Sequence, residues 1–416
     1  MIGRLIFLIS WGVSLSASTL FGEWVKGDLL VKGGTIITVG GEVIEGGSIW
    51  IEDGVIRKVG IDLRAPDGTP VYEATGKYIM PGIVDTHSHL GVYSWPDVDA
   101  NSDGNEATDP ITPQVRAIDA INIHDPGFDR ARAGGVTTIQ ILPGSANLIG
   151  GQSAVIKLRP VDSVEELIFQ GAPPGMKMAF GENPKRIYGE RNQQPSTRMG
   201  NAYLLRKAFV DARNYMAKWE RYESKVKDKE HLPERDLKME ALADILRGKY
   251  RIHFHCYRAD DILTLIGISD EFDFPIASLQ HCLEGYKVAE EIARHNIGVA
   301  TFSDWWGFKM EAWDAIPHGA YLMSRKGVRV AIHSDSGDII QRLYHEAAKT
   351  VRYGQSEEEA FRSITVNPAW MLGLDDRIGS IEEGKDGDLA IFSGHPFSIY
   401  SLVDATVIDG VVVYER

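Results

Sequence analysis

The sequence predicts an α/β protein: a (β/α)8 TIM-like barrel with a small β-sandwich domain formed by both ends of the chain. Three observations predict this fold. Short apolar runs alternate with amphipathic stretches through the centre of the chain, β-rich runs with Gly-Gly and Asp-Gly turns lie near both ends, and polar residues that can bind metal follow several central runs. The length of 416 residues accommodates one barrel of about 250 residues and a smaller domain.

The first segment, residues 1–18, has the three parts of a secretory signal peptide. Arg4 precedes an apolar stretch from Leu5 to Leu15, and small residues follow at positions 16–18. This stretch is too short to cross a bilayer as a helix, and no other segment has the apolar length of a membrane span. We therefore expect an exported protein, periplasmic or extracellular. The alternative is a cytoplasmic protein that begins with a strand or helix.

Residues 26–80 and 375–416 are predicted to form the β-sandwich together. The stretch "SIWIEDGVIRKV" predicts a hairpin with Asp53 and Gly54 at its turn, and "ATVIDGVVVYE" repeats the pattern near the end of the chain. Neither end alone has enough strands for a stable β-domain, so we expect the two ends to pair with each other.

Residues 81–374 are predicted to form the barrel, because strand–helix alternation favours a parallel sheet covered by helices. The apolar runs are "GIVDTHSHL", "GVTTIQILPG", "GMKMAFGE", "RIHFHCY", "IASLQHC", "GVATFSD" and "VRVAIHSD", and "SAVIKLR" is expected to supply the remaining strand. Two stretches depart from a plain barrel. The connection from Gly91 to Asp125 is long, and residues 199–247 predict a charged helical insertion that is solvated or covers the barrel mouth.

Composition narrows the range of functions. Hydrophobic residues make up 44% and charged residues 25% of the chain, as in soluble globular proteins. The net charge of −14 argues against a nucleic-acid partner, because phosphate binding needs clustered Lys and Arg. We expect a small-molecule substrate, and the composition leaves the formation of homo-oligomers open.

Six residues that can bind metal end five predicted barrel strands, and the C-terminal ends of barrel strands are where catalytic groups lie. They are His87, His89, Glu182, His255, His281 and Asp335. Residues i and i+2 of a strand point the same way, so His87 and His89 both face the barrel mouth. Imidazole and carboxylate ligands predict one or two divalent ions, with zinc preferred and iron, manganese or nickel as alternatives.

Two further histidines and two cysteines lie beside these ligands. His253 and His333 occupy same-face positions two residues before predicted ligands, and we expect both to be hydrogen-bonded deeper in the barrel. Cys256 and Cys282 each follow a predicted histidine ligand, so they are expected to face outward as small buried apolar groups. A thiol nucleophile would require the opposite orientation.

Taken together, "MPGIVDTHSHL", "AGGVTTIQILPG", the histidines that close two strands and "TVNPAWMLGLDDRIGSIEEGKDGDLAIF" resemble the amidohydrolase superfamily. The nearest branch is the imidazolonepropionase-related and Xaa-Pro-dipeptidase-like group. The resemblance extends over nearly the whole chain after residue 27. It implies a distorted (β/α)8 barrel, a flanking β-sandwich from both termini, and one or two catalytic metal ions.

Residue by residue, the resemblance implies that His87 and His89 bind the more buried metal and that His255 and His281 bind the second. It also implies that Asp335 binds metal and moves a proton. Many relatives have a carboxylated lysine on strand four. There this sequence has Glu182 at the predicted strand end, which we favour as the bridging ligand, and Lys177 and Lys185 are the alternatives.

These residues predict a metal-dependent amidohydrolase that acts on a C–N bond of an amide, cyclic amide or dipeptide. A metal-activated hydroxide attacks the carbonyl carbon, and Asp335 passes the water's proton to the leaving nitrogen. A deaminase of an amino-substituted heterocycle is the alternative on the same fold. A binding protein without catalysis would lack at least one ligand, and none is missing.

Three residues are weaker candidates for substrate binding. Arg258 follows the strand-five ligand and could pair with a substrate carboxylate, or with Asp260 or Asp261 instead. Asn147 and Gln152 lie in the Gly-rich stretch "GSANLIGGQ", which is expected beside the barrel mouth and which lacks the Gly-Lys-Ser/Thr ending of a phosphate-binding loop.

Overall fold

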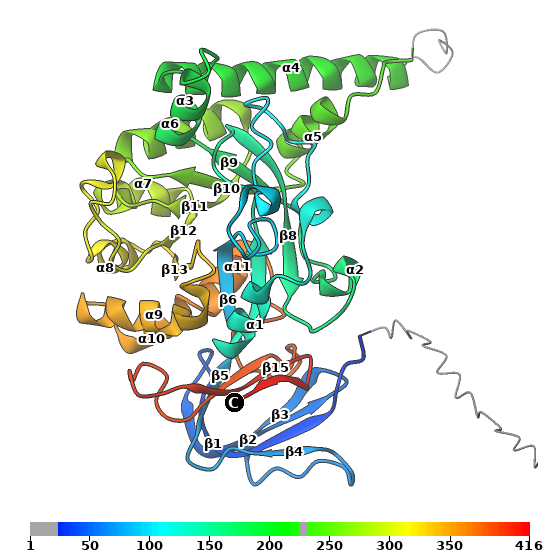
Figure 1. The fold of residues 1–416 in the computed structure, drawn as a ribbon, viewed down its shortest axis with the longest axis vertical. Helices are drawn as coiled ribbons and strands as arrows, with labels where there is room; N and C mark the ends of the chain where they lie inside the picture. Colours follow the sequence, from blue (N-terminus) through cyan, green and yellow to red (C-terminus); the bar gives the residue numbers. More distant parts are fainter. Residues whose placement is uncertain (1–23, 225–231) are drawn as a thin grey trace, which may run out of the picture.

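The computed structural model describes residues 24–224 and 232–416. In this part of the chain, two eight-stranded sheets form two stacked bodies (Figure 1). The upper body is a barrel-like sheet surrounded by helices, and the lower body is a separate sheet domain. The predicted combination of a (β/α)8-like barrel with a separate sheet domain is confirmed at this level.

The lower sheet combines the two ends of the chain. Its strand order is β16-β15-β14-β5-β1-β2-β3, and β4 pairs with β1. The strands are β1 (Leu29–Ile37), β2 (Val43–Glu52), β3 (Val55–Ile61), β4 (Val71–Glu73), β5 (Tyr78–Pro81), β14 (Leu389–Phe392), β15 (Val403–Ile408) and β16 (Val411–Glu415). The antiparallel pairing of β5 with β14 joins the two ends, which explains why neither end needs to be stable alone.

Both Asp-Gly pairs lie where the hairpins turn. Asp53 and Gly54 connect β2 to β3 with φ angles of 51° and 72°. Asp409 and Gly410 connect β15 to β16 with φ angles of 51° and 76°. Two-residue hairpin turns of type I′ need positive φ at both central residues, and Asp-Gly is a favoured pair for them. The predicted hairpins are therefore confirmed with the expected turn chemistry.

The predicted sandwich is one continuous hydrogen-bonded sheet that curls over its own core, rather than two separate layers. The Ile56 N–H in β3 donates to Lys385 O at 2.8 Å, and the Gly387 N–H donates to Gly54 O at 2.7 Å. These bonds bring an edge strand back to the segment before β14. The enclosed core consists mainly of inward-facing aliphatic side chains such as Val31, Ile49 and Ile391.

The upper sheet has its eight strands in chain order. They are β6 (Ile83–Ser88), β7 (Val136–Ile141), β8 (Ile149–Lys157), β9 (Gly175–Ala179), β10 (Arg251–Cys256), β11 (Ile276–His281), β12 (Gly298–Thr301) and β13 (Val330–Ile332). The strands from β9 to β13 run parallel to one another. Their residues are almost all buried, as in a sheet covered on both faces.

One strand corrects the prediction of a fully parallel barrel. The "SAVIKLR" run forms part of β8, which pairs antiparallel with both β7 and β9. The connection between β7 and β8 contains only residues 142–148 and no helix. A parallel return needs a crossover of a dozen or more residues, so a connection this short forces the chain to reverse.

Hydrogen bonds outside the regular strand pairs close the barrel between β13 and β6. On one side, the Ile332 N–H donates to Ser363 O and the Val84 N–H donates to Ile364 O, both at 2.9 Å. At the mouth, the Asp335 N–H donates to His87 O at 3.0 Å. This last bond brings the residues that follow β13 directly to the end of β6.

Helices cover the outside of the barrel, and strands and helices alternate from β10 to β13. The helices are α1 (Pro126–Ala133), α2 (Val164–Leu167), α3 (Glu182–Gly189), α4 (Arg198–Ser224), α5 (Leu237–Leu246), α6 (Ala259–Phe272), α7 (Ala289–Arg294), α8 (Gly319–Ser324), α9 (Leu343–Arg352), α10 (Glu357–Arg362) and α11 (Val366–Leu372). Short 3-10 turns lie at Asp99–Asn101, Ala117–Ala120, Gly285–Val288, Met310–Ala312 and Ile340–Arg342.

The charged stretch after residue 198 is helical, as predicted. Helix α4 crosses the top of the structure in Figure 1. Its buried residues include Leu205, Ala208, Phe209 and Ala212, which share one helix face. From residue 213 to the end of α4, the side chains are exposed or half-buried. The first half of α4 therefore packs on the barrel and the second half is solvated.

The predicted signal peptide lies within residues 1–23, outside the described part of the chain, and stays a prediction. Among the helices of residues 24–224 and 232–416, none is both long enough and apolar enough to cross a membrane.

Candidate metal centre

Histidine and carboxylate side chains converge where the barrel strands end. His87 lies in β6 and His89 follows it, His255 lies in β10, His281 ends β11, and Asp335 comes shortly after β13. His87, His255 and His281 are at most 2% exposed, whereas His89 and Asp335 are partly open to solvent. The structure thus brings five of the six predicted ligands together at the barrel mouth.

His87, His89 and Asp335 form the tightest group, which we call the mouth cluster. Asp335 Oδ1 lies 3.1 Å from His87 Nε2 and 3.3 Å from His89 Nε2. The two Nε2 atoms are 3.3 Å apart. Two ligand atoms that each lie about 2.0–2.1 Å from a tetrahedral zinc ion are separated by about 3.3 Å. The three donor atoms are therefore spaced as they would be around one ion.

Hydrogen bonds on the far side of each ring fix which nitrogen carries the proton. His89 Nδ1 lies 2.7 Å from Leu142 O, and a carbonyl oxygen can only accept, so Nδ1 is the protonated nitrogen. His87 Nδ1 donates to Gln280 Oε1 at 2.9 Å in the same way. Both Nε2 atoms consequently present lone pairs to each other and to the Asp335 carboxylate. Three acceptors this close repel one another unless a cation lies among them.

The environment of His87 disfavours a proton on its Nε2 as that cation. Burial lowers the pKa of His87 well below its ordinary value, and the nearby Lys177 lowers it further. Burial alone would raise the pKa of Asp335, whereas His281 and His87 would hold it well below its ordinary value if they carried a proton. A neutral imidazole beside an ionised carboxylate is the protonation state that binds a divalent metal.

The backbone of Asp335 has a left-handed conformation, with φ at 55°. Asp tolerates this region better than most residues. The conformation turns the chain sharply after β13, and the bond from the Asp335 N–H to His87 O holds the turn against β6. This turn places the carboxylate beside His87 and His89.

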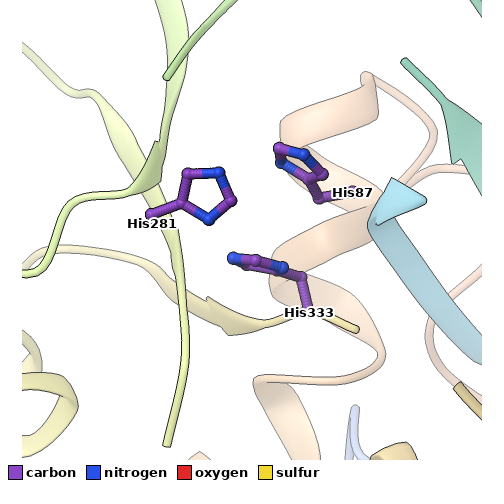
Figure 2. A group of neighbouring side chains, drawn as sticks. All are labelled: His87, His281 and His333. Carbon is purple, nitrogen blue, oxygen red and sulfur yellow. The ribbon is translucent and has the colours of Figure 1, made fainter. Parts of the chain in front are cut away.

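A second group, which we call the inner cluster, consists of His87, His281 and His333. The distances between ring centroids are 4.6 Å for His87–His281, 4.9 Å for His87–His333 and 4.9 Å for His281–His333. Figure 2 shows the three rings around a common space. All three residues are at most 2% exposed.

His281 enters this space by a departure from strand alternation. Gln280, the residue before it, also has its side chain inside the barrel, because it bonds His87 and Ser278. Successive residues of a strand point to opposite faces, so His281 would face outward in a regular strand. Its φ of 67° breaks the strand and turns the ring inward. Sequence reasoning missed Gln280 because it assumed regular alternation.

The two histidines of β10 have different partners. His255 Nε2 lies 3.3 Å from Asn183 Nδ2, and its buried Nδ1 has no hydrogen-bond partner among the described residues. The His255 ring centroid is 4.7 Å from that of His281. His253 Nδ1 lies 2.8 Å from Ser278 Oγ, as expected for a hydrogen-bonded core residue. His255 therefore lies beside His281 of the inner cluster, and His253 is held by Ser278.

Burial lowers the pKa of every histidine in the barrel interior for which a shift is resolved. The pKa of His255 and of His281 lies well below the ordinary value, that of His253 is lowered to about 3, and that of His333 to about 4. These rings are neutral at pH 7 and each keeps a lone pair for a cation.

The structure does not bring Glu182, our first choice on strand four, to these histidines. Glu182 is the first residue of α3, its side chain is 32% exposed, and its nearest cation is Lys309 at 3.9 Å. It lines a separate cavity of about 730 Å³ together with Lys185 and Arg258. Strand β9 ends at Ala179, before the predicted end, so Glu182 lies on the helix that follows rather than on the strand.

Lys177 occupies the strand-four position inside the barrel. It lies in β9, is fully buried, and its Nζ donates to Pro143 O at 3.1 Å. Pro143 follows directly on Leu142, which accepts the bond from His89. Burial lowers the pKa of Lys177 to about 7, although Asp335 opposes the shift. The alternative that sequence analysis ranked second is thus the one that lies beside the ligands.

Asp85 is a second residue that sequence reasoning missed. It is fully buried in β6 and accepts hydrogen bonds from the His87 N–H at 3.0 Å and from the Ser334 hydroxyl at 2.5 Å. Burial raises its pKa to about 7, and the bonds from Ser334 and His87 limit the rise. Asp85 ties β6 to the residues after β13. An aspartate at the same-face position before two histidines was the signal that could have identified it.

The three residues suggested for substrate binding have other partners. Arg258 forms a two-bond pair with Asp260, with both distances at 2.8 Å, which is the alternative that the sequence left open. Asn147 is buried and bonds Glu106 O, Thr112 Oγ1 and the Tyr188 hydroxyl. Gln152 donates to Pro113 O at 3.2 Å. These bonds hold Asn147 and Gln152 against the long connection after β6. Both residues therefore support the position of that connection.

A cavity of about 370 Å³ opens directly onto the mouth cluster. Its lining includes His89 and Asp335, together with Tyr93, Trp95 and Asp338. The rings of Tyr93 and His89 lie edge to face with centroids 5.6 Å apart. A cavity of this size with aromatic walls and convergent polar groups is typical of small-molecule sites.

Comparisons with known proteins show a family and a fold to which this chain is similar. Residues 306–414 match the Amidohydrolase family. A crystal structure of an amidohydrolase from Thermotoga maritima MSB8 superposes with a TM-score of 0.88, and the two sequences are 44% identical over 93% of this chain and 100% of that one. A prolidase complexed with n-methylphosphonate-l-proline has a TM-score of 0.59 at 15% identity, with 94% of this chain and 100% of that chain covered, which indicates a shared fold alone.

Curated relatives include enzymes of several names. Amidohydrolase tasK of Hapsidospora irregularis is 35% identical over 395 residues, which are 89% of this chain and 40% of the relative. This chain therefore spans about two fifths of the length of that relative. The imidazolonepropionase of Clostridium tetani is 22% identical over 441 residues, with 94% of this chain and 99% of the relative covered.

Proposed function

This chain belongs to the amidohydrolase superfamily, in its imidazolonepropionase-like branch, and from this premise we propose that it is a metal-dependent enzyme. The comparisons identify a hydrolase that acts on carbon–nitrogen bonds. The proposed substrate is a small amide, cyclic amide or dipeptide. A divalent cation, preferably zinc, is the proposed cofactor, with iron, manganese or nickel as alternatives.

A single observation supports metal dependence more than any other. In the mouth cluster, two imidazole lone pairs and a carboxylate oxygen lie within 3.3 Å of one another with no proton donor among them. Buried polar atoms are normally paired, and an arrangement of mutually facing acceptors is stable only with a cation. The unpartnered buried Nδ1 atoms of His255 and His281 add to the same conclusion.

The residues fit two ions. His87, His89 and Asp335 would hold the first, and His255 and His281 would hold the second, with Lys177 between them. A bound divalent cation supplies a water nucleophile with a lowered pKa and polarises the substrate carbonyl. The hydrogen bonds that His89 Nδ1 donates to Leu142 O and that His87 Nδ1 donates to Gln280 Oε1 keep the Nε2 lone pairs in place.

Lys177 is suited to a bridging role only after modification, because a protonated amine repels cations. Its pKa of about 7 leaves a substantial fraction of neutral amine at pH 7. The amine lone pair would attack the carbon of carbon dioxide and the nitrogen would release one proton, which gives an N-carboxylate. That group would offer carboxylate oxygens to the metal ions, in the role for which sequence analysis favoured Glu182.

Asp335 is the proposed proton carrier. One of its oxygens faces both His87 and His89, and its side chain is 28% exposed at the cavity in which a substrate would lie. Its carboxylate accepts a proton from the attacking water and delivers it to the leaving nitrogen as the C–N bond breaks. Tyr93 and Trp95 would hold the substrate against this carboxylate and exclude water from it.

A substrate screen with paired variants tests the proposal. The panel contains N-acyl amino acids, Xaa-Pro and Xaa-Arg dipeptides and cyclic ureides, with ammonia release from purines and pyrimidines as a separate readout. We expect D335N to lower kcat/KM by at least about 100-fold. D129N is the control, because Asp129 is a carboxylate that is 80% exposed, pairs with Arg132 and is not among the residues that line this cavity, and it should stay within a few-fold of wild type.

Full activity of D335N would contradict the proposed proton transfer. Ammonia release from a heterocycle without hydrolysis of any amide would replace the proposal with the deaminase alternative.

A further inference from the structure

His253 and His333 have equivalent positions but different surroundings. Each lies two residues before a proposed ligand, and each is 1% exposed. His253 has a hydrogen-bond partner, since its Nδ1 lies 2.8 Å from Ser278 Oγ. Neither ring nitrogen of His333 has a partner among the described residues, although both are buried. The structure therefore separates two histidines for which the sequence predicts the same supporting role.

The lack of partners is costly for His333. A neutral imidazole carries one N–H donor and one acceptor, and burying both without bonds is unfavourable. The ring lies against Phe302, with centroids 4.5 Å apart, which offers no hydrogen-bond partner. Its polar neighbours are His87 and His281, whose ring centroids are each 4.9 Å away. One ring nitrogen from each of the three histidines lies within 4.8 Å of the other two.

A water molecule alone fits this space poorly. His87 keeps its proton on Nδ1, where Gln280 binds it, so His87 offers a lone pair and not a donor. The buried Nδ1 of His281 also has no partner. A water has two hydrogens to donate and cannot satisfy several imidazole lone pairs at once. A divalent cation accepts three imidazoles readily, as in tri-histidine zinc sites.

We infer that His333 is a metal ligand, which binds a divalent cation together with His281 at the inner cluster shown in Figure 2. His87 is close enough to belong to this site, but its single lone pair also faces Asp335. In a protein with two ions, His87 would bind the ion of the mouth cluster, and His333 would join His281 as a ligand of the second ion. The ligand set implied by the resemblance to the superfamily leaves His333 out.

This inference rests on the proposed function, because it concerns a ligand of the proposed metal, and cobalt binding separates the two. Wild type, H333Q and H253Q are stripped of metal with a chelator and titrated with Co²⁺, with the visible absorption spectrum and the competition affinity as readouts. Loss of a residue that hydrogen-bonds a metal ligand typically weakens metal binding by about 10–100-fold. We expect H333Q to weaken Co²⁺ binding at the inner site by more than about 100-fold and to change the absorption spectrum. We expect H253Q to keep the wild-type spectrum and to weaken Co²⁺ binding by less than about 10-fold.

The possible results have distinct meanings. If wild type binds Co²⁺ tightly and H333Q has the same affinity and spectrum, the role of His333 is overturned. The proposed function then stays intact. Failure of wild type to bind Co²⁺ at all would overturn both. If H333Q does not fold, wild-type crystals soaked in Zn²⁺ decide: a metal peak about 2.1 Å from a His333 ring nitrogen supports the inference. Metal peaks that all lie too far from both ring nitrogens of His333 for coordination would overturn it.

Discussion

Two lysines are fully or almost fully buried in the described part of the chain, and they have opposite surroundings. Lys157, which ends β8, is 1% exposed, and its Nζ lies 2.7 Å from Asp386, 3.0 Å from Asp388 and 2.6 Å from Asp409. Lys177 in β9 is fully buried, and the one hydrogen bond found for its Nζ goes to Pro143 O. The first lysine joins the barrel to the lower sheet, and the second faces the histidines of the barrel mouth.

The pKa values of the two lysines shift in opposite directions. Burial alone would lower the pKa of Lys157, but Asp388, Asp409 and Asp386 raise it above its ordinary value. Burial lowers the pKa of Lys177 to about 7 because Asp335 opposes it only in part. Charges at the domain junction are matched by partners within the chain. Charges and lone pairs at the mouth are not matched, which is the signature of a site that is completed by a ligand.

The largest expected effect is that of K177M on activity. Without the amine, neither ion can be bridged, so we expect kcat/KM to fall by at least about 100-fold and the content of the second metal to fall with it. The free energy of unfolding should stay equal or rise, because methionine removes a poorly paired polar group from the interior. Kinetics, metal content and chemical denaturation measure the three quantities. A fully active K177M enzyme would refute a bridging role for Lys177.

The matched change at the junction, K157M, should have the reverse profile. Removing the cation leaves three buried carboxylates close together, which we expect to lower the free energy of unfolding by about 3–5 kcal/mol. Activity per folded molecule should remain within a few-fold of wild type, because Lys157 contacts no residue of the mouth cluster that the structure describes. Urea denaturation and kinetics at low temperature check both statements. A large loss of kcat in folded K157M would contradict the separation of the two regions.

The junction also predicts a pH dependence of stability. Burial raises the pKa of Asp388 to about 6, and Lys157 opposes the rise. An unfolded aspartate has a pKa of about 3.9. Because the folded pKa is raised, this group favours folding below about pH 4, and its contribution is lost as the pH rises toward 6. In D388N the titration is absent.

The free energy of unfolding of D388N minus that of wild type should therefore become more positive between pH 4 and pH 6. Denaturation curves of both proteins across this range measure the difference. A difference that is constant with pH would show that Asp388 does not titrate as the structure indicates.

The smallest expected effect is that of R258A. Its guanidinium pairs with Asp260 at the surface, where both side chains are largely exposed. Exposed pairs contribute about 0–1 kcal/mol, so stability should change by no more than that. If Arg258 binds no substrate carboxylate, KM should also be unchanged. A rise in KM of more than about tenfold for acidic substrates alone would restore the role first suggested by the sequence.

The sequence predicted those features that depend on local pattern. Strand ends, Asp-Gly turns and the i, i+2 spacing of His87 and His89 are encoded within a few residues. Convergence of His255, His281 and Asp335 followed from the barrel, since its strand ends share one face. These predictions needed the fold class and no distances.

The errors arose where the chain departs from regular strands. Strand β9 ends three residues before Glu182, so Glu182 lies on a helix, and Lys177 is the strand-four residue that lies inside the barrel. The positive φ of His281 turns two consecutive side chains into the barrel, which a period of two excludes. The reversal of β8 depends on the length of one loop. None of these departures has a signal in composition or periodicity.

The metal content of the purified protein tests the central claim most directly. Inductively coupled plasma mass spectrometry of protein purified without chelators should find about one or two zinc, iron, manganese or nickel ions per chain. The content should fall below half of that value when His87 and His89 are both replaced by alanine. A wild-type protein that holds no stoichiometric divalent metal, even after dialysis against zinc, would contradict the account.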